Sequence, residues 1–322
     1  MKAVLYHRYG APDVLRLEET DMPAVPDDGV RVRVRAAALN AIDVYFLTGQ
    51  PPFIRLMAGP FGPRRKLLGT DFAGTVESVG SRVTRLRAGD EVYGATRGTL
   101  AEFVCAAEWR MALKPANLTF EQAAAVPLAG ITALQGLRDR AQVRPGQRVL
   151  INGASGGVGT FAVQIARALG AEVTAVCSTK HVERARSLGA DKVIDSTRED
   201  FTRGEQGYDV LFDIAGNHAW SEYRRVLKPR AICVVVGRPR GKGAIGPLGS
   251  LVQMLLASAF DSRRIGLFMA RMKPEDLAAL AALIEAGRVT PVIDRRYELV
   301  EAAEGFRHQL DGHPSGKVVI AL

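Results

Sequence analysis

The residues with the clearest chemical meaning form a glycine-rich turn between an apolar run and a helix-forming run. Glycines let a ligand approach the backbone, and the free N–H groups at a helix N-terminus attract negative charge. Ala154 and Ser155 follow Gly153, so Gly156 and Gly159 must supply the close approach and the helix–strand packing. The strand before the turn, the helix after it and a second strand beyond predict a pyrophosphate site. Its candidate contacts are Gly153, Ser155, Gly156, Gly157, Val158 and Gly159.

The end of the second strand indicates which dinucleotide binds. An NAD site usually has Asp or Glu there, but this strand runs into Ser178-Thr179-Lys180 without a carboxylate. Lys180 and Arg184 lie one turn apart at the start of the next helix, where the helix dipole disfavours cations. A 2′-phosphate bound by Ser178, Lys180 and Arg184 accounts for them; the alternative is a solvated pair partly balanced by Glu183. We therefore predict NADPH (NADP⁺) rather than NAD(H).

Alternating strand and helix patterns surround this turn and must position it. Such alternation predicts a parallel sheet covered by helices on both faces. The expected elements are 148–152, 157–169, 172–176, 182–188, 192–195, 208–214, 220–227 and 232–236.

Residues 1–117 have a different texture, that of a compact β-rich barrel. The segment 30–35 alternates strictly between valine and arginine, as in a half-buried strand. Thr119 and Gln122 have capping-box spacing, which predicts a helix across 119–137. The chain ends with a helix at 274–286, another short helix and a strand at 317–320.

Length and composition set outer limits. A chain of 322 residues predicts two domains. The N-terminus lacks a leader core, and the apolar run 245–260 is broken and too short to span a membrane. We therefore expect a soluble, cytoplasmic protein. The three cysteines (105, 177 and 233) form no C-x-x-C motif, so we expect buried inert thiols.

The net charge of +9 has one local concentration, between Arg224 and Lys242. Such a surface could attract nucleic acid or acidic membranes. Because no aromatic residues interleave with its charges, we favour a solvated face or a field that draws in a polyanionic cofactor. The basic residues are Arg224, Arg225, Lys228, Arg230, Arg238, Arg240 and Lys242.

Several motifs, in this order and spacing, resemble the medium-chain dehydrogenase/reductase superfamily, specifically its zinc-independent quinone oxidoreductase and enoyl-reductase-like branch. The resemblance implies an α/β fold with a GroES-like β-rich catalytic domain (1–117 and 273–322) around a Rossmann NADP-binding domain (118–272), and a homodimer. Besides the glycine turn, the segments that carry it are Ala38–Tyr45, Leu68–Val76, Arg87–Gly94, Gly130–Leu134 and Leu188–Asp195.

The departures from zinc alcohol dehydrogenases concern the metal. Asn40 stands at the first ligand position, Thr70 replaces the histidine of the G-H-E segment, and the four-cysteine lobe is missing. Because zinc is bound by Cys, His and carboxylate ligands at fixed places, we predict that no zinc binds.

Four residues resemble the family's catalytic site. Asn40 and Thr132 are expected near the nicotinamide and its ribose. Tyr45 would donate a hydrogen bond or a proton to the substrate oxygen, or is a core tyrosine whose hydroxyl is satisfied elsewhere. Asp43 is expected to pin its own loop rather than act as a general base, and Asp71 to fasten a turn.

The resemblance implies two further cofactor contacts. Lys317 matches a basic residue that reaches the pyrophosphate, although a lysine before a terminal strand is by default merely exposed. Asn217 lies where the chain passes the nicotinamide half. Gly237 is a further candidate cofactor contact. The apolar insertion 51–66 would border the mouth of the cleft, unless its composition reflects ordinary loop packing.

Together these features predict a zinc-free, NADPH-dependent reductase of small apolar quinones or α,β-unsaturated carbonyls. One rival is a metal-free NADP-linked alcohol or ketone oxidoreductase. The other is an NADPH-binding protein with a nucleic-acid-binding role, which only the basic stretch favours.

Overall fold

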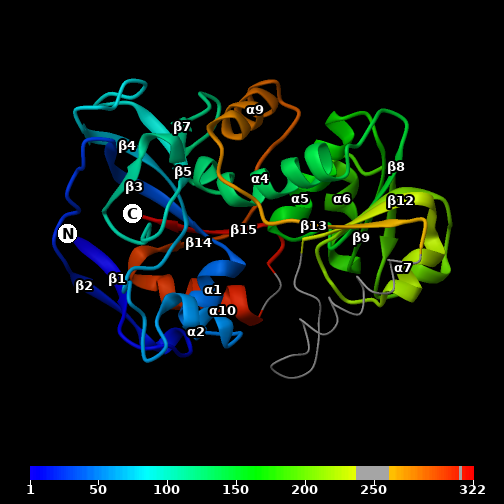
Figure 1. Ribbon diagram of the computed structural model, residues 1–322, viewed down its shortest axis with the longest axis horizontal. Helices are drawn as coiled ribbons and strands as arrows, with labels where there is room; N and C mark the ends of the chain where they lie inside the picture. The colour runs from blue at the N-terminus through cyan, green and yellow to red at the C-terminus, as the bar shows by residue number, and fades with distance from the viewer. Residues whose placement is uncertain (237–260, 312–313) are drawn as a thin grey trace. The chain divides into compact units, whose positions relative to one another are not determined.

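The structure, a computed structural model, describes residues 1–236, 261–311 and 314–322. The chain divides into two compact units (Figure 1). Unit 1 comprises Met1–Ile131, Met272–Gly287 and Pro291–Leu322; unit 2 comprises Thr132–Arg271 and Arg288–Thr290. Both chain ends therefore belong to one unit, and the other is inserted between them.

In the described part of unit 2, a six-stranded parallel sheet forms the centre. Its order is β10 (Lys192–Asp195), β9 (Glu172–Cys177), β8 (Arg148–Asn152), β11 (Tyr208–Asp213), β12 (Leu227–Val235) and β13 (Arg264–Leu267). Numbered from β8 along the chain, this order is 3-2-1-4-5-6, the doubly wound Rossmann arrangement. The predicted Rossmann domain is confirmed. Among its described strands, β13 is the one that the sequence analysis did not predict.

The helices of unit 2 follow the strands as the alternation predicted. Helix α5 (Gly157–Ala168) packs against β8 and β9, α6 (Val182–Ser187) against β9 and β10, and α7 (Trp220–Val226) against β12. Nearly every side chain of α5 after its first turn is buried. This burial holds the N-terminus of α5 at the carboxyl end of β8.

Unit 1 contains a seven-stranded, mostly antiparallel sheet. The path is β14 (Ile293–Glu298), β15 (Lys317–Ala321), β3 (Gly29–Leu39), β4 (Asp71–Val79), β5 (Glu91–Ala95) and β7 (Met111–Leu113), with β6 (Phe103–Ala107) also paired to β3. In β3 the valines are buried while Arg33 and Arg35 are exposed, as the alternation predicted. A small sheet joins β1 (Lys2–Tyr6) to β2 (Leu15–Glu19).

One strand pairing in unit 1 positions the candidate site. Strand β15 runs antiparallel to β3, with Val318 opposite Leu39. Lys317 therefore lies beside Asn40, although 277 positions separate them in the chain. Figure 1 shows the red C-terminal strand entering this sheet.

Of the described helices, five lie wholly in unit 1 and α4 runs from unit 1 into unit 2, while both units contain short helical turns. The helices are α1 (Ala41–Thr48), α2 (Phe53–Ala58), α3 (Phe120–Ala124), α4 (Pro127–Leu134), α9 (Pro274–Glu285) and α10 (Ala302–Asp311). The 3₁₀ turns are Pro12–Val14, Glu108–Arg110, Thr179–His181, Phe201–Arg203 and Leu299–Glu301.

The helix expected across 119–137 is interrupted. Its capping box is present, since the Gln122 backbone N–H donates to the Thr119 hydroxyl and the Thr119 N–H donates to the Gln122 side chain. Pro127 begins a new helix because it lacks the N–H that would continue the first one. A π-helical turn, Gln135–Arg140, follows.

The unit boundaries differ from the expected 117/118 and 272/273. Helix α3 packs on β3 and β4, and the Leu128 N–H donates to Asp71 at 3.1 Å, so residues 118–131 belong with unit 1. Thr290 joins unit 2 because its backbone makes two hydrogen bonds with the Gln164 side chain.

Among the described residues, none of the helices has both the length and the apolar character needed to cross a bilayer.

Candidate functional site

The glycine turn of unit 2 contains two glycines that its own fold requires and a third, Gly156, that leaves space for a ligand. Gly153 has a φ of +91°, a region that favours glycine. A Cβ on Gly159 would lie 2.2 Å from the Gly153 carbonyl oxygen, so this glycine allows the helix to pack on the turn. At Gly156 the nearest atom to such a Cβ is 3.9 Å away. The turn thus keeps open space where a ligand would approach its backbone.

The start of α5 is suited to an anion. Gly156 is the N-cap, with φ −78° and ψ 177°, and within the described chain no side chain caps this end. The first N–H groups of a helix have no intrahelical partners, and they carry the positive end of its dipole. A pyrophosphate fits this uncapped end and the open space at Gly156.

A buried hydrogen-bond cluster ties the ends of β8 and β11 together. The Asn152 side-chain amide donates to Asp213 and to the Asn217 side chain, both at 2.8 Å. Asp213 also accepts from the Tyr223 hydroxyl at 2.8 Å and the Gly216 N–H at 3.1 Å. Burial raises the pKa of the Asp213 carboxyl, and these donors oppose that rise. The cluster fixes the loop that carries Asn217.

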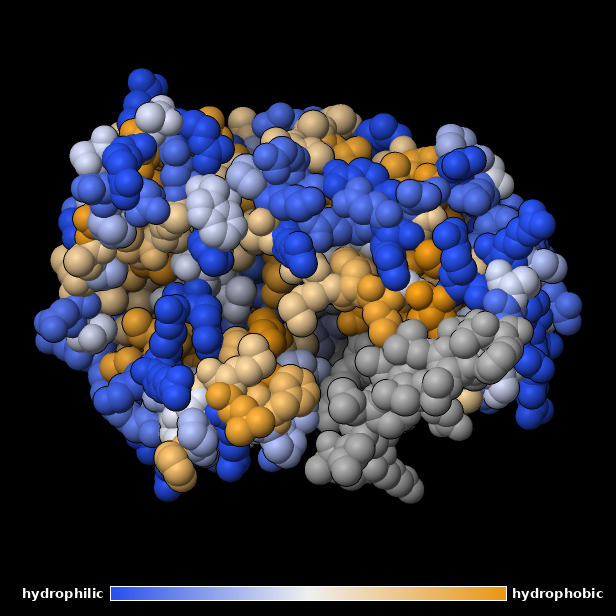
Figure 2. Space-filling view, in the orientation of Figure 1, coloured by the Kyte–Doolittle hydropathy of each residue, from blue (hydrophilic) through white to orange (hydrophobic). Residues whose placement is uncertain are grey.

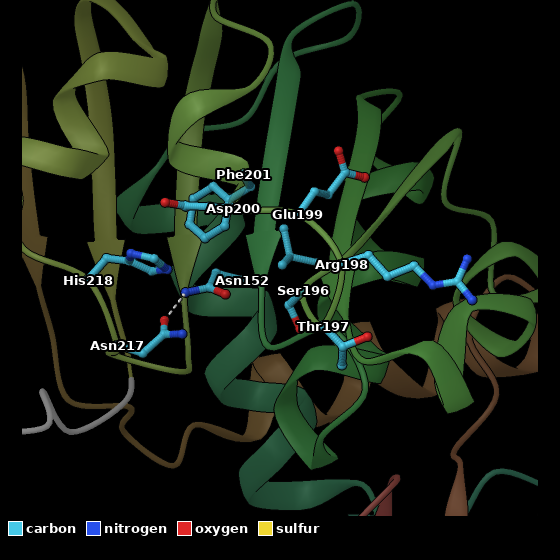
Figure 3. Close-up of a pocket in the computed structure, with 10 residues that line it drawn as sticks. Asn152, Ser196, Thr197, Arg198, Glu199, Asp200, Phe201, Asn217 and His218 are labelled. Carbon is cyan, nitrogen blue, oxygen red and sulfur yellow. Dashed lines mark hydrogen bonds between the residues drawn. The ribbon is translucent and has the colours of Figure 1, made fainter.

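A cavity of about 420 Å³ opens beside this cluster. It is lined by Asn152 and Val176 at strand ends, by the loop 196–201, and by Asn217 and His218. Figure 3 shows Asn152 and Asn217 meeting at its wall, while Arg198 and Glu199 extend away from them. The cavity lies at the carboxyl ends of parallel strands on both sides of β8, where doubly wound sheets bind nucleotides.

The three residues predicted to hold a 2′-phosphate follow β9. Ser178 begins the turn Thr179–His181, Lys180 lies in it, and Arg184 lies on α6. Lys180 and Arg184 are exposed. The ion pair that Glu183 makes, at 2.5 Å, is with Arg186.

Sequence reasoning missed a carboxylate near this turn. Asp195, the last residue of β10, accepts a hydrogen bond from the Thr179 hydroxyl at 2.7 Å and lies 3.4 Å from Arg198. The Thr179 bond is the main cause that lowers the pKa of Asp195. Asp195 lies beside this turn because β10 pairs in parallel with β9, with Asp195 opposite Cys177. No local sequence pattern reveals that pairing.

Unit 1 holds a buried ionic cluster that joins distant parts of the chain. The Lys317 ammonium donates to the Asn40 side-chain oxygen at 2.5 Å and to Asp71 at 3.2 Å. The Asn40 amide donates to the same Asp71 oxygen at 3.0 Å. Lys317 is 3% exposed and Asp71 0%. These contacts account for the burial of Lys317 within unit 1, and they hold both ends of the Asn40 amide.

A second carboxylate, Asp43, borders this cluster. It accepts from the Asn40 backbone N–H at 2.8 Å and from the Thr70 hydroxyl at 2.5 Å. Burial raises its pKa to about 7, against the effect of those two donors, and burial also raises the pKa of Asp71. Asp43 thus holds the start of α1 through the Asn40 N–H and ties it to Thr70.

The other two catalytic candidates are Tyr45 and Thr132. Tyr45 is half-buried on α1, and among the described residues its hydroxyl has no hydrogen-bond partner. Thr132 lies on α4, at the first position assigned to unit 2. The structure therefore brings Asn40, Asp43 and Lys317 together with Thr70 and Asp71, and leaves the Tyr45 hydroxyl without a partner inside its own unit.

The donor set of this cluster does not fit zinc. Asn40 and Thr70 are neutral, and the Lys317 ammonium, which cannot act as a ligand while protonated, fills the space between Asn40 and Asp71. In the described ranges, no group of three or more His, Cys, Asp or Glu residues is placed to hold a metal ion.

Part of the predicted surface and one cofactor contact lie outside the described residues. These are Gly237, the basic residues Arg238, Arg240 and Lys242, and the apolar run 245–260. Arg224, Arg225, Lys228 and Arg230 are described and exposed, and Lys228 pairs with Asp209 at 2.9 Å.

Comparison with known families gives two matches on this chain. Residues 26–116 match the alcohol dehydrogenase GroES-like domain, and residues 188–320 match the family described as zinc-binding dehydrogenase.

Curated relatives and solved structures extend the similarity over the full length. Quinone oxidoreductase of Pseudomonas aeruginosa is 35% identical over 99% of both chains. The chloroplastic NADPH-dependent alkenal/one oxidoreductase of Arabidopsis thaliana is 34% identical, over 99% of this chain and 79% of the relative. The structure of Escherichia coli quinone oxidoreductase complexed with NADPH is 27% identical, with a TM-score of 0.83 and 100% of both chains covered.

Proposed function

Because the chain belongs to the quinone oxidoreductase branch of the medium-chain dehydrogenase/reductase superfamily, we propose that it is an NADPH-dependent reductase of quinones or α,β-unsaturated carbonyls. The named activities of its relatives are quinone reduction and alkenal/one reduction, the latter with NADPH. Both acceptor types take a hydride at an electron-poor carbon or oxygen. NADPH supplies that hydride when bound, and the protein binds, orients and protonates.

The observation that carries this proposal is the glycine turn of unit 2. Its open space at Gly156 and the uncapped N-terminus of α5 fit a pyrophosphate, and the adjoining cavity of about 420 Å³ suits a nucleotide end. The candidate pyrophosphate contacts are the N–H groups of Ser155, Gly156, Gly157, Val158 and Gly159.

Selection of NADPH over NADH rests on the turn after β9. Ser178, Lys180 and Arg184 would hold the 2′-phosphate, with two exposed cations and a hydroxyl as its donors. The Asp195 carboxylate next to this turn accepts a hydrogen bond from Thr179 and pairs with Arg198. Asn217, fixed by Asn152, is the proposed contact of the nicotinamide half.

Proton delivery is assigned to Tyr45. Its hydroxyl has no partner in the described part of the chain, whereas the Asn40 amide and the Asp43 carboxyl are both occupied. Asn40 and Thr132 remain the proposed neighbours of the nicotinamide and its ribose. A phenol is a competent hydrogen-bond donor to a developing enolate or hydroquinone oxygen.

We propose that the reaction proceeds without zinc. The Lys317 ammonium supplies the positive charge of the cluster around Asn40 and Asp71, and this donor set does not suit a metal. Lys317 would therefore act inside unit 1, in place of the pyrophosphate contact that the resemblance implies.

Domain roles, assembly and location are part of the same proposal. Unit 1 is the catalytic domain and unit 2 the cofactor domain. A cytoplasmic homodimer agrees with the three free cysteine thiols, which are usual in a reducing compartment. The outer edge of β13, unpaired among the described strands, is a place where a second copy could add.

The experiment that tests the activity is a matched set of initial rates. NADPH and NADH oxidation is followed with a quinone, an enone and a simple ketone. We expect NADPH to be preferred and the ketone to be inert. Preference for NADH would overturn the cofactor assignment, and turnover of the ketone alone would favour a metal-free alcohol or ketone oxidoreductase.

A further inference from the structure

Helix α2 and the loop after it carry a concentrated set of exposed apolar side chains. Leu56 and Met57 are 75% and 71% exposed, and Phe61 in the loop is 104% exposed. Ile54 and Ala58, on the other side of α2, are buried. Figure 2 shows a hydrophobic area over α2 with hydrophilic side chains beside it. We call Phe53, Leu56, Met57 and Phe61 the α2 patch.

The patch is held on a fixed platform. The Arg64 N–H donates to the Ala58 carbonyl at 2.8 Å and closes the loop that carries Phe61. The Tyr9 hydroxyl donates to the Gly59 carbonyl at 2.8 Å, and the Arg55 guanidinium stacks over the Tyr9 ring at 5.2 Å. A tethered segment thus presents these apolar side chains outward, and they remain exposed in the described structure.

The charge around the patch has one sign. The sequence contains no Asp or Glu from Val44 to Thr70. Arg55, Arg64, Arg65 and Lys66 are all exposed, and none of them takes part in an ion pair with the residues that the structure describes. The two acidic residues that flank this stretch, Asp43 and Asp71, are buried in the ionic cluster.

We infer that the α2 patch docks on an anionic lipid surface. Apolar side chains among exposed cations are the combination by which interfacial segments bind acidic membranes. Each arginine near such a surface strengthens binding roughly fivefold, since it contributes about 1 kcal/mol. A second copy of the same patch is disfavoured as the occupant, because it would bring eight like charges face to face.

Docking on lipid would give the enzyme access to substrates dissolved in the bilayer. Quinones and long-chain enones partition into bilayers, so a reductase that rests on the lipid surface meets them at high local concentration. This consequence rests on the proposed function, whereas the docking itself does not. The segment also coincides with the insertion 51–66, which the resemblance places at the cleft mouth.

The test measures sedimentation with vesicles of phosphatidylcholine, alone and mixed with phosphatidylglycerol. We expect binding to the anionic vesicles, weakened by salt and nearly lost in pure phosphatidylcholine. Leu56→Ser/Met57→Ser should weaken it about tenfold, as expected for losing two partly inserted side chains. The matched control is Val300→Ser/Met269→Ser, at positions 71% and 88% exposed but outside the patch.

A second pair of variants separates local from general attraction. Arg64→Gln/Arg65→Gln and Arg224→Gln/Arg225→Gln lower the net charge equally, from the +9 of the natural chain. We expect only the first pair to reduce vesicle binding, by roughly 25-fold. Circular dichroism confirms that each variant is folded.

Three results would overturn the docking surface. They are absence of binding to anionic vesicles, equal losses in the two arginine pairs, and self-association of the wild type that Leu56→Ser/Met57→Ser abolishes. NADPH oxidation by wild type with a water-soluble quinone is measured in parallel. Activity without vesicle binding removes this inference alone, and vesicle binding without activity removes the proposed function alone.

Discussion

The proposed phosphate-binding turn of unit 2 and the ionic cluster of unit 1 differ in the groups that provide their positive charge. The turn uses backbone groups from one continuous stretch, 152–159, and its key feature is a missing side chain at Gly156. The cluster uses side chains from Asn40, Asp71 and Lys317, which only strand pairing brings together. The first N–H groups of α5 have no partner inside the helix and can face a ligand, whereas the cluster satisfies its groups internally.

This difference separates two kinds of functional residue. A backbone site can still bind a ligand because its N–H donors cannot hydrogen-bond to one another. It tolerates a substitution wherever the new side chain blocks neither the ligand nor the packing of the turn. An internally paired cluster holds geometry and charge, and it fails when one partner is removed. A side chain added at the ligand-facing position of the turn should therefore change cofactor binding, whereas loss of a partner in the cluster should change stability.

Removing the ammonium should have the largest effect. Lys317→Met leaves Asp71 buried without its cation, which we expect to cost about 3–5 kcal/mol in the free energy of unfolding. Urea unfolding measures it. The double variant Lys317→Met/Asp71→Asn serves as the control and should recover much of the loss. Additive effects of the two substitutions would contradict the pairing.

The second effect is a pH dependence that Asp43 contributes. Its pKa is about 7 in the folded chain, above its ordinary unfolded value, so the folded chain binds more protons between these pH values. Its contribution to stability is therefore full at low pH and is lost as pH rises toward and through 7.

Asp43→Asn removes this dependence. Between pH 5 and pH 8, the variant should gain about 2.5 kcal/mol in the free energy of unfolding relative to wild type. Urea unfolding at the two pH values measures this gain, with Asp21→Asn as an exposed-carboxylate control. Parallel pH profiles of Asp43→Asn and wild type would show that Asp43 is ionised throughout.

The third effect compares two glycines of the turn. Gly156→Ala puts a methyl group into open space, so we expect unchanged melting temperature but about tenfold weaker NADPH binding by calorimetry. Gly159→Ala would bring its Cβ to 2.2 Å from a carbonyl oxygen, so it should lower the melting temperature instead. Equal effects of the two substitutions on binding and stability would contradict the separate roles of Gly156 in ligand binding and Gly159 in packing.

The turn could be predicted from sequence because its strand, glycines and helix are contiguous, so local patterns carry all the information. Strand β13 could not, because Arg264-Ile265-Gly266-Leu267 has little strand character of its own and is extended by pairing with β12. Residues 118–131 likewise follow their packing on β3 and β4 rather than any signal at residue 117.

The ionic cluster was only partly predictable. The capping geometry of Asp43 is local and was expected, but a lysine before a terminal strand is usually exposed. Its burial depends on the register of β15 on β3, which no pattern near Lys317 reveals. Asp195 escaped notice for the same reason, since its position beside Thr179 depends on the register of β10 and β9.

The central claim is that this chain transfers hydride from NADPH with a cluster whose cation is Lys317 and without zinc. The most direct test is the rate of NADPH oxidation with a quinone, measured on protein dialysed against a chelator and analysed for metal by mass spectrometry. The account predicts substoichiometric zinc, an unchanged kcat, and no stimulation by added Zn²⁺. Loss of activity after chelation and its recovery with Zn²⁺ would contradict it.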